Sequence, residues 1–353
     1  MTADRQSVIS VNSRILSYPM TGVPRYLKEL LQRMPESGLR QISPDLPLSG
    51  IRAHLWEQSL LPLRARGNLL WSPGNAGPLT ISKQVVTIHD VVSLDHPEWL
   101  NPRFAAWYRF LTPKLARRVR RVITVSEFTK IRLLETTGIS EEKIIVIPLG
   151  VDPRFAPMDQ TNTSEIAKKL GLRSDHYVLS LGSLEPRKNL GRLLRAWEIV
   201  SDRLPTDIWL VVSGAKGNRM VFQDVPELKK LPDRVFLTGR VADEDLPKLY
   251  AGAMAFAYPS VYEGFGLPPL EAMASGAPTL VGNCASLPEV VGDAAVRVDP
   301  FDIEAIAEGL LRLLEDDTMR TKLRANGLKR VAQFNWERTA AQTWQVLVEA
   351  AEE

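Results

Sequence analysis

The sequence has only one cysteine, Cys284, among its 353 residues. A lone cysteine forms no disulfide within the chain, and it excludes zinc modules that need several cysteine ligands. Such sparse use of cysteine is typical of proteins from a reducing compartment. We therefore expect cores that hold together without covalent or metal cross-links.

Long apolar runs are also missing. No stretch of about 18 or more apolar residues is present, so the sequence predicts no membrane-spanning helix. The N-terminal segment MTADRQSVIS is polar and lacks the apolar centre of a secretory signal peptide. We therefore expect a cytoplasmic protein.

Charge is unevenly distributed along a chain whose net charge is only +3. Residues 1–150 hold 20 Lys and Arg against 12 Asp and Glu, whereas residues 151–353 hold 24 against 29. The basic segment 114-KLARRVRR-121 is either a solvated helix face or a surface for anionic lipid headgroups or an anionic acceptor. It has no interleaved aromatic residues for base stacking, which argues against nucleic acid as a partner. We expect peripheral contact with the inner face of the cytoplasmic membrane.

Short runs rich in Val and Ile alternate with segments of helical apolar spacing, such as 189–200 and 303–316. The runs are continuously apolar, as in strands buried on both faces of a parallel sheet. This alternation predicts doubly wound α/β layers. The candidate strands are 85–92, 121–126, 143–150, 177–182, 208–214, 234–239, 254–260, 278–283 and 295–300.

The polar segment 152–166 interrupts this pattern and predicts an interdomain linker. We expect a first domain over 1–160 and a second over 161–334. Residues 335–353 predict a C-terminal helix, capped by Asn335, that packs back toward the first domain. Two facing α/β domains would leave a ligand cleft at the C-terminal ends of their strands.

The stretch 262-YEGFGLPPLEAMASG-276 places two carboxylates around a predicted helix start. Its two prolines suit the first turn of a helix, and its final Ser-Gly suits the end. Glu263 then lies in the preceding loop, and Glu271 in the first or second turn. Backbone N–H groups at a helix start bind phosphate, and carboxylates accept from vicinal diols. The alternative is structural, with Glu263 capping the loop and Glu271 complementing the helix dipole.

A second segment, 183-SLEPRKNLGRLL-194, follows a predicted strand. Asn189 suits a helix N-cap, and Arg187 and Lys188 precede it. Two cations beside a helix start form a clamp for a diphosphate. A surface turn with solvated charges is the alternative. Together the two segments predict a ligand whose anionic centre carries a sugar at each end.

These segments resemble the signature of family 4 of the retaining glycosyltransferases. Glu263, GFGLPPLEA and Glu271 match the family's E-x7-E motif, and 185-EPRKN-189 resembles its phosphate-binding turn. The resemblance implies the GT-B fold, in which two facing Rossmann-like doubly wound parallel-sheet domains use a nucleotide diphosphate sugar without a metal or other cofactor. It covers nearly the whole chain, with further similar segments at 21–31, 124–130, 147–152, 239–253 and 335–340.

The resemblance also implies a role for each site residue. Glu271 would hold the ribose diol and Glu263 the hydroxyls of the transferred sugar. Arg187 and Lys188 would neutralise the departing diphosphate. The implied donor-binding residues are Gly22, Arg187, Lys188, Val241, Glu263, Gly264, Phe265, Gly266, Leu267 and Glu271, and the implied catalytic residues are His89, Arg187, Lys188 and Glu263.

His89 and three further segments also have expected roles. His89 would face the transferred sugar, and the alternative is a core histidine bonded to the backbone. Segments 214–218 and 239–243 would contact the base. Residues 243–245 match a D-x-D metal motif, but acids also suit the helix start expected there, so we expect no metal site.

We predict a retaining glycosyltransferase that moves a hexose from a nucleotide diphosphate sugar to a glycan or lipid-linked acceptor in cell-surface polysaccharide synthesis. Overall resemblance to bacterial polysaccharide mannosyltransferases favours mannose, with GDP-mannose as donor. The alternatives are a UDP-sugar donor with a soluble acceptor, a sugar-nucleotide epimerase, and a non-catalytic nucleotide-sugar binder. A nicotinamide dehydrogenase shares the fold class, but the strand-to-helix turns lack its G-x-G-x-x-G fingerprint.

Overall fold

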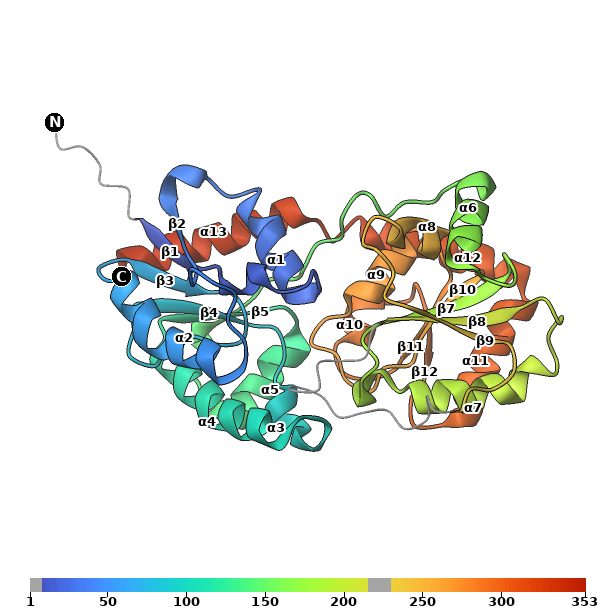
Figure 1. The fold of residues 1–353 in the computed structure, drawn as a ribbon, viewed down its shortest axis with the longest axis horizontal. Helices are drawn as coiled ribbons and strands as arrows, with labels where there is room; N and C mark the ends of the chain where they lie inside the picture. The colour runs from blue at the N-terminus through green and yellow to red at the C-terminus, as the bar shows by residue number, and fades with distance from the viewer. Residues whose placement is uncertain (1–7, 215–229) are drawn as a thin grey trace. The chain divides into compact units, whose positions relative to one another are not determined.

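The structure is a computed structural model that describes residues 8–214 and 230–353. Its chain divides into two compact units (Figure 1). Unit 1 comprises Met1–Pro97, Pro102–Gly150 and Asn335–Glu353, and unit 2 comprises Glu98–Asn101 and Val151–Phe334. Within the described ranges, no helix is both long and apolar enough to cross a membrane.

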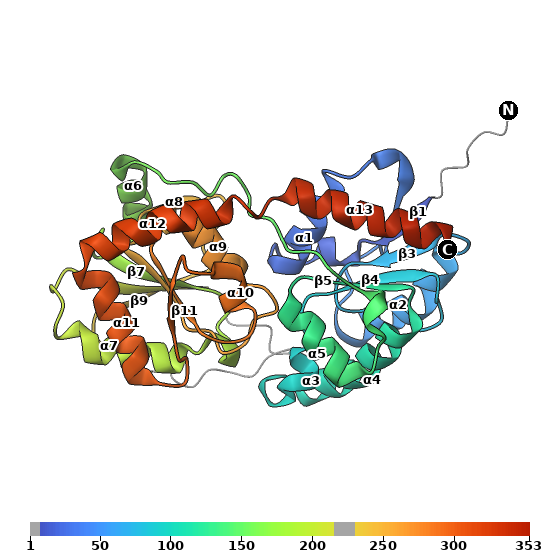
Figure 2. The ribbon, with the colours of Figure 1, turned by 180° about the vertical axis from the view of Figure 1, so that it is seen from behind.

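Unit 1 is built on a six-stranded sheet in the order β2-β1-β3-β4-β5-β6, and every pairing is parallel. Helices α1 and α13 cover one face of this sheet, and α2, α4 and α5 cover the other (Figures 1 and 2). The strands are β1 (Ile9–Asn12), β2 (Leu39–Ile42), β3 (Leu69–Ser72), β4 (Gln84–Ile88), β5 (Arg121–Thr124) and β6 (Ile144–Val146). The helices are α1 (Gly22–Leu31), α2 (Gly50–Arg64), α3 (Val92–Asp95), α4 (Pro102–Arg118), α5 (Glu127–Thr137) and α13 (Trp336–Glu352), with short 3₁₀ turns at η1 (Arg14–Ser17), η2 (Glu36–Gly38), η3 (Pro97–Trp99) and η4 (Glu141–Lys143).

Unit 2 has a second six-stranded parallel sheet, in the order β12-β11-β10-β7-β8-β9. Its core packs α7 and α11 against the sheet around the fully buried Trp197. The strands are β7 (Tyr177–Leu181), β8 (Trp209–Ser213), β9 (Val235–Gly239), β10 (Ala255–Tyr258), β11 (Thr279–Gly282) and β12 (Val296–Val298). The helices are α6 (Gln160–Leu170), α7 (Leu190–Ser201), α8 (Leu246–Ala251), α9 (Leu267–Ala274), α10 (Leu287–Val291), α11 (Ile303–Glu315) and α12 (Asp317–Val331), with the 3₁₀ turn η5 (Pro186–Lys188).

The strand order of unit 2 reverses at β7. The chain moves outward through β8 and β9 and then returns to place β10 on the other side of β7. Loops that leave neighbouring parallel strands on either side of such a reversal diverge and leave room for a ligand. The loops that follow β7 and β10 are therefore the expected binding loops of this unit.

The predicted fold class, two doubly wound parallel sheets, is confirmed, and each of the nine predicted strands overlaps a strand of the structure. Three further strands, β1, β2 and β3, were not predicted. Each is only four residues long, and β2 exposes Arg40 and Gln41 at the sheet edge, so no continuous apolar run marks it.

The predicted linker over 152–166 is wrong in its second half, because α6 begins at Gln160. The polar composition suggested a loop, but Ile166 and Ala167 are buried and α6 packs on α8. The pairs Lys169–Asp245 at 2.7 Å and Lys248–Glu165 at 2.8 Å also join the two helices. Packing therefore overrides the weak helix propensity of the Thr- and Asn-rich start of α6.

The C-terminal helix begins as the sequence predicts. Asn335 is the N-cap of α13, and its side-chain oxygen accepts from the N–H of Arg338 at 2.8 Å. Within unit 1, α13 packs against α1, and Thr339 donates to the carbonyl of Pro148 at 2.8 Å. Gly150 lies so close to this helix that a Cβ there would come within 2.3 Å of the Trp336 nitrogen.

Candidate functional site

The two sequence segments singled out above meet in unit 2, because β7 and β10 are hydrogen-bonded neighbours. The N–H of Val261 donates to the Arg187 carbonyl at 2.9 Å, and the hydroxyl oxygen of Ser260 lies 2.8 Å from the same carbonyl. Asn189 occupies the N-cap position of α7 as predicted, but with a left-handed backbone (φ 59°) and no side-chain capping bond. Its amide instead donates to the carbonyls of Pro259 and Pro300, at 2.9 and 2.6 Å, and ties the two loops together.

Four charged residues, Glu185, Arg187, Lys188 and Glu263, form a compact charge cluster where these loops join. One oxygen of Glu263 accepts from Lys188 at 2.6 Å, and the other accepts from Arg187 at 2.9 Å. Arg187 also contacts Glu185 at 3.3 Å. Two cations and two carboxylates thus leave this cluster without net charge.

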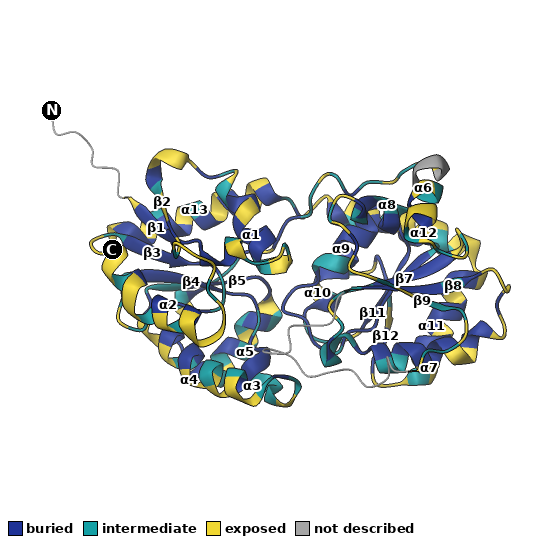
Figure 3. Cartoon of the chain, viewed as in Figure 1, coloured by how far each residue is buried: buried dark blue, intermediate teal, exposed yellow. Residues whose placement is uncertain are grey.

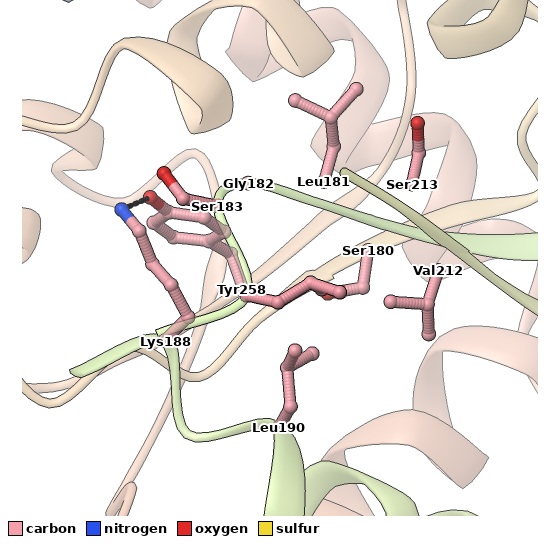
Figure 4. Close-up of a pocket in the computed structure, with 10 residues that line it drawn as sticks. Ser180, Leu181, Gly182, Ser183, Lys188, Leu190, Val212, Ser213 and Tyr258 are labelled. Atoms are coloured by element: carbon pink, nitrogen blue, oxygen red, sulfur yellow. Dashed lines mark hydrogen bonds between the residues drawn. The ribbon is translucent and has the colours of Figure 1, made fainter. Parts of the chain in front are cut away.

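Two neutral hydroxyls complete the surroundings of Glu263. Tyr258 and Ser260 donate to the same oxygen that faces Lys188, at 2.8 and 2.7 Å. Lys188 in turn donates to the Tyr258 oxygen at 2.5 Å, so this phenol accepts from the lysine while it donates to the carboxylate. Figure 4 shows Lys188 and Tyr258 side by side at a small hollow of about 10 Å³ that Gly182 and Ser183 also line.

Burial and neighbouring opposite charges shift the pKa values of Glu263 and Lys188 in opposite directions. Burial alone would raise the pKa of Glu263, but Lys188, Arg187 and the hydrogen bonds lower it to about 2. Burial, together with Arg187, lowers the pKa of Lys188 although Glu263 opposes this shift. Burial and the Glu263 charge raise the pKa of Tyr258, which therefore stays a neutral phenol. The carboxylate is thus held ionised and the phenol held as a donor.

Glu185 is the member of the cluster that sequence reasoning did not single out. Its side chain is only 1% exposed, and its second carboxylate oxygen has no hydrogen-bond partner in the structure. A buried carboxylate oxygen without a donor is costly, so such a group calls for an explanation. Glu185 lies in the segment EPRKN, and its type and position were the available signal. Tyr258 and Ser260 were likewise missed, because their contacts depend on the order of the strands.

Glu271 lies on α9, as the two prolines of its first turn predict. Its side chain is buried, and Tyr250 of α8 donates to it at 3.0 Å. Gly266 is the N-cap residue of α9 with a φ of 121°, and a Cβ at this position would come within 2.9 Å of Leu287. Glycine is therefore required where the loop 264–267 turns into the helix. In that loop Phe265 is buried and contacts Phe334 edge-on.

The other predicted residues of unit 2 lie on the loop after β9. Val241 is buried between β9 and α8. In the acidic segment 243–245, Asp243 pairs with Arg154 at 2.6 Å and Asp245 pairs with Lys169 at 2.7 Å. The predicted base-contacting segment 214–218 lies outside the described residues apart from Gly214.

Two predicted site residues belong to unit 1. Gly22 is the first residue of α1, and a Cβ there would meet no atom within 4 Å. His89 follows β4, and its Nε2 bonds the Pro73 carbonyl at 2.8 Å, which requires the proton on Nε2. Burial lowers the pKa of His89 to about 4, so the ring is neutral at pH 7. These contacts are those of a backbone-held histidine, the alternative raised from the sequence, and Tyr26 packs edge-on against the ring at 4.8 Å.

Known protein families match this chain over both units. The family model described as Glycosyltransferase Family 4 matches residues 67–155, and that described as Glycosyl transferases group 1 matches residues 162–330. The O-antigen chain mannosyltransferase B of Escherichia coli is 30% identical over 368 residues, which cover 93% of this chain and 96% of that relative. The serotype-specific mannosyltransferase WbdA of Escherichia coli is 31% identical over 271 residues, and this chain covers only 32% of its length.

A solved structure agrees with these matches at the level of the fold. The Anabaena protein HepE, in complex with UDP and glucose, superposes with a TM-score of 0.76 at 18% identity and covers 97% of this chain and 99% of its own. At such an identity the likeness shows the GT-B fold alone. The family models and the homologous mannosyltransferases carry the assignment further: this chain belongs to glycosyltransferase family 4, the retaining hexosyltransferases.

Proposed function

We propose that this protein transfers mannose from GDP-mannose to a glycan or lipid-linked acceptor in the synthesis of a cell-surface polysaccharide. The observation that carries the donor class is the charge cluster at the C-terminal ends of β7 and β10. It brings two cations to the loops where a doubly wound sheet binds its ligand. Mannose is favoured by the similarity to O-antigen chain mannosyltransferase B.

Arg187 and Lys188 stabilise the departing nucleotide diphosphate in this proposal. Negative charge builds on the diphosphate as the bond to the anomeric carbon breaks, and fixed donors facing that charge lower the barrier. Lys188 is held at Nζ by Glu263 and Tyr258, and an ammonium has three donors, so one remains for a phosphate oxygen. The two carboxylates balance the cations before the donor arrives and keep both side chains in place.

Glu263 both holds these cations and receives a hydroxyl of the transferred sugar. One of its oxygens already accepts from three side chains. The other accepts from Arg187 and has a lone pair left for a sugar hydroxyl. A pKa of about 2 keeps this oxygen an acceptor throughout the physiological range.

The remaining roles follow the family resemblance. Glu271, oriented by Tyr250, accepts from the ribose diol, and backbone groups of loop 264–267 lie beside the sugar. Val241 contacts the base, and Gly22 lets the start of α1 approach the phosphates. His89 acts as a neutral acceptor through Nδ1, because its Nε2 proton is bound to the backbone. Retention follows from attack on the face that the diphosphate leaves, with the departing phosphate taking the acceptor's proton.

A UDP-sugar with a soluble acceptor is the alternative donor and acceptor pair. HepE was solved with UDP and glucose and shares the fold, so a uridine donor suits this architecture. We favour GDP-mannose because similarity over nearly the full length links the chain to a mannosyltransferase. A cytoplasmic location beside the membrane's inner face completes the proposal.

Thermal unfolding with GDP, UDP, ADP, dTDP and NAD tests the donor. A ligand present at about 100 times its Kd stabilises by roughly 2.7 kcal/mol, a shift of a few degrees for a chain of this size. We expect GDP to raise Tm and GDP-mannose to be consumed with an added lipid-linked glycan. A shift with UDP alone would replace the donor by a UDP-sugar. A shift with NAD alone would refute the proposed nucleotide-sugar donor.

A further inference from the structure

We propose that the outer surface of α2 and α4 in unit 1 is a docking face for an anionic lipid bilayer. We call this surface the α2–α4 face. The inference deepens the proposed function, because a lipid-linked acceptor lies in such a membrane. Its basis is an unusual concentration of exposed apolar side chains framed by cations.

Helix α2 exposes a row of aliphatic side chains. Ile51, Leu55 and Leu63 are 75%, 61% and 55% exposed. Ile51 and Leu55 are four residues apart and share one side of the helix, and Leu63 follows about two turns after Leu55. The buried residues of α2 are Ala53, Trp56, Glu57 and Leu61. Leu46, in the loop before α2, and Leu60, on another side of the helix, are also exposed, at 74% and 47%. Among the described residues, half of the large apolar side chains that are exposed lie here or on α4.

Helix α4 adds cations and aromatic rings. Phe110 is 48% exposed in the middle of its outer side, and the ammonium of Lys114 lies 3.8 Å from the ring centroid. Trp107 stacks on Phe110 with the ring centroids 6.0 Å apart. Arg109, which precedes Phe110 in the sequence, is also exposed. Amphipathic aromatic and basic side chains of this kind suit the boundary between headgroups and acyl chains.

The two helices form one continuous surface. His54 of α2 packs against Trp107 of α4 with the ring centroids 5.4 Å apart. Both helices cover the same face of the sheet, and their outer sides carry much of the exposed surface in this part of unit 1 (Figures 2 and 3). The aliphatic row of α2 therefore adjoins the basic and aromatic side of α4.

The charges of α2 and α4 favour an anionic lipid surface as the partner of this face. Both helices are described in full: α4 contains no acidic residue, and the one acid of α2, Glu57, is 1% exposed and bound to Asn12 and Arg14. Asp45, in the loop before α2, is held by Arg64 at 3.2 Å. A second copy of the chain would place like charges on α4 against one another or leave them unmatched. A surface of anionic headgroups complements them and accommodates the aliphatic row as well.

Vesicle flotation tests the proposal with the full chain. We expect the protein to float with vesicles that contain phosphatidylglycerol, more weakly with phosphatidylcholine alone, and less at high salt. The double variant Ile51→Ser/Leu55→Ser should lower the partition coefficient about tenfold, because two aliphatic side chains no longer enter the interface. Arg109→Gln/Lys114→Gln should lower it about fivefold for each cation, and only with anionic vesicles.

Matched variants on unit 2 are the controls. Ile199→Ser/Leu328→Ser removes two side chains that are 45% and 39% exposed, and Lys322→Gln/Lys329→Gln removes two exposed cations. Both should bind vesicles like the wild type. If the wild type does not float, or if the α2 and α4 variants float as it does, the α2–α4 face is not a membrane site. A dimer that Ile51→Ser/Leu55→Ser dissociates would also overturn the proposal. Tm shifts with GDP need no lipid, so they report separately on the proposed donor.

Discussion

At the scale of single residues, Tyr258 is the side chain that links the anion and the cation of the charge cluster. Its phenol donates to Glu263 at 2.8 Å and accepts from Lys188 at 2.5 Å. It is fully buried, and no charged form of it is available because its pKa is raised. Removing the Tyr258 oxygen would therefore leave Glu263 and Lys188 in place but without one of their hydrogen-bond partners.

Tyr258→Phe tests this linkage. We expect kcat/KM to fall, with a loss of transition-state stabilisation of about 1.5–3 kcal/mol. This is the usual range for a hydrogen bond to a charged group. The basic limb of the pH–rate profile should also move to lower pH, because Lys188 loses an acceptor that favours its charged form. Steady-state kinetics across pH measure both effects.

Tyr177→Phe is the matched control for this variant. Its phenol is equally buried in unit 2 but donates to the Leu249 carbonyl at 2.8 Å, at the opposite end of the strand β7. This control should lose stability without changing the pH–rate profile. If both variants left the profile in place, Tyr258 would have a structural role only.

Glu271 offers a second prediction at this scale. Glu271→Gln keeps the shape of the side chain but removes the charge that would accept from a ribose diol. We expect nucleotide affinity to fall by about 1.5–3 kcal/mol, measured calorimetrically with the nucleoside diphosphate. Tyr250→Phe, which leaves the carboxylate in place but removes its donor, should cost less. If Glu271→Gln and the wild type bound the nucleoside diphosphate with equal affinity, Glu271 would not bind the ribose.

The sequence predicted the charged residues of the site better than their partners. Arg187, Lys188 and Glu263 stood out because they lie in motifs, and the structure brings the charged atoms of Arg187 and Lys188 within 2.9 Å of the Glu263 carboxylate. Tyr258 and Ser260 carry no such signal, since a tyrosine or serine at a strand end is ordinary. Their contacts arise only after β10 pairs with β7, a pairing between segments about 75 residues apart in the chain.

At the scale of elements, the start of α9 depends on a single glycine. Gly266 has a φ of 121°, which side chains with a Cβ rarely adopt, and its neighbour Leu287 leaves no room for a methyl group. The sequence indicated this helix start through its two prolines, but the strained turn before it was visible only in the structure. The backbone geometry of Gly266 therefore fixes the loop 264–267.

Gly266→Ala should lower the free energy of unfolding by about 1–3 kcal/mol through backbone strain and the contact with Leu287. Gly22→Ala is the comparison, because its Cβ would enter open space. We expect Gly22→Ala to change stability by less than about 0.5 kcal/mol while raising the KM for the donor. Urea unfolding measures the change in stability of each variant, and donor kinetics measure the change in KM. A Gly22→Ala enzyme with unchanged KM would show that the start of α1 does not approach the phosphates.

The helices and strands that were predicted, and those that were missed, show how far local sequence patterns determine secondary structure. Strands buried on both faces, such as β4 and β5, were predicted because their apolar runs are continuous. The edge strand β2 was missed because its middle residues face solvent, and α6 was taken for linker because its stabilising contacts come from α8. Both errors have the same origin, since tertiary contacts rather than local composition decide these segments.

At the scale of the whole molecule, the two units differ in how they respond to acid. In unit 1, burial lowers the pKa of His89 to about 4, below its ordinary value of 6.5. In unit 2, Lys188 and Arg187 overcome the effect of burial and lower the pKa of Glu263 from 4.5 to about 2. Both shifts mean that the unfolded chain binds a proton more readily than the folded one, so both groups make stability rise with pH. Their windows, however, do not overlap much.

Stability should therefore fall in two stages as pH decreases. Between about pH 6.5 and 4 the unfolded state gains a proton at residue 89 that the buried ring does not accept, which costs on the order of 3 kcal/mol for a shift of this size. Burial and the Arg14 charge also lower the pKa of His54 to about 4, so His54 lowers stability in the same pH window. Glu263 contributes only below its unfolded pKa of about 4.5, and its stabilisation is lost as pH falls toward 2.

His89→Gln separates the stages, because glutamine keeps a side-chain N–H for the Pro73 carbonyl but does not titrate. We expect urea unfolding of the wild type to give a lower free energy at pH 5 than at pH 7.5, and His89→Gln to lose less over the same interval, because the contribution of His54 remains. Glu263→Gln, although destabilised at both pH values, should keep the wild-type difference between them. A wild-type difference that survives His89→Gln unchanged would mean that the ring is not held neutral in the folded state, and with that the proposed acceptor role of its Nδ1 would fail.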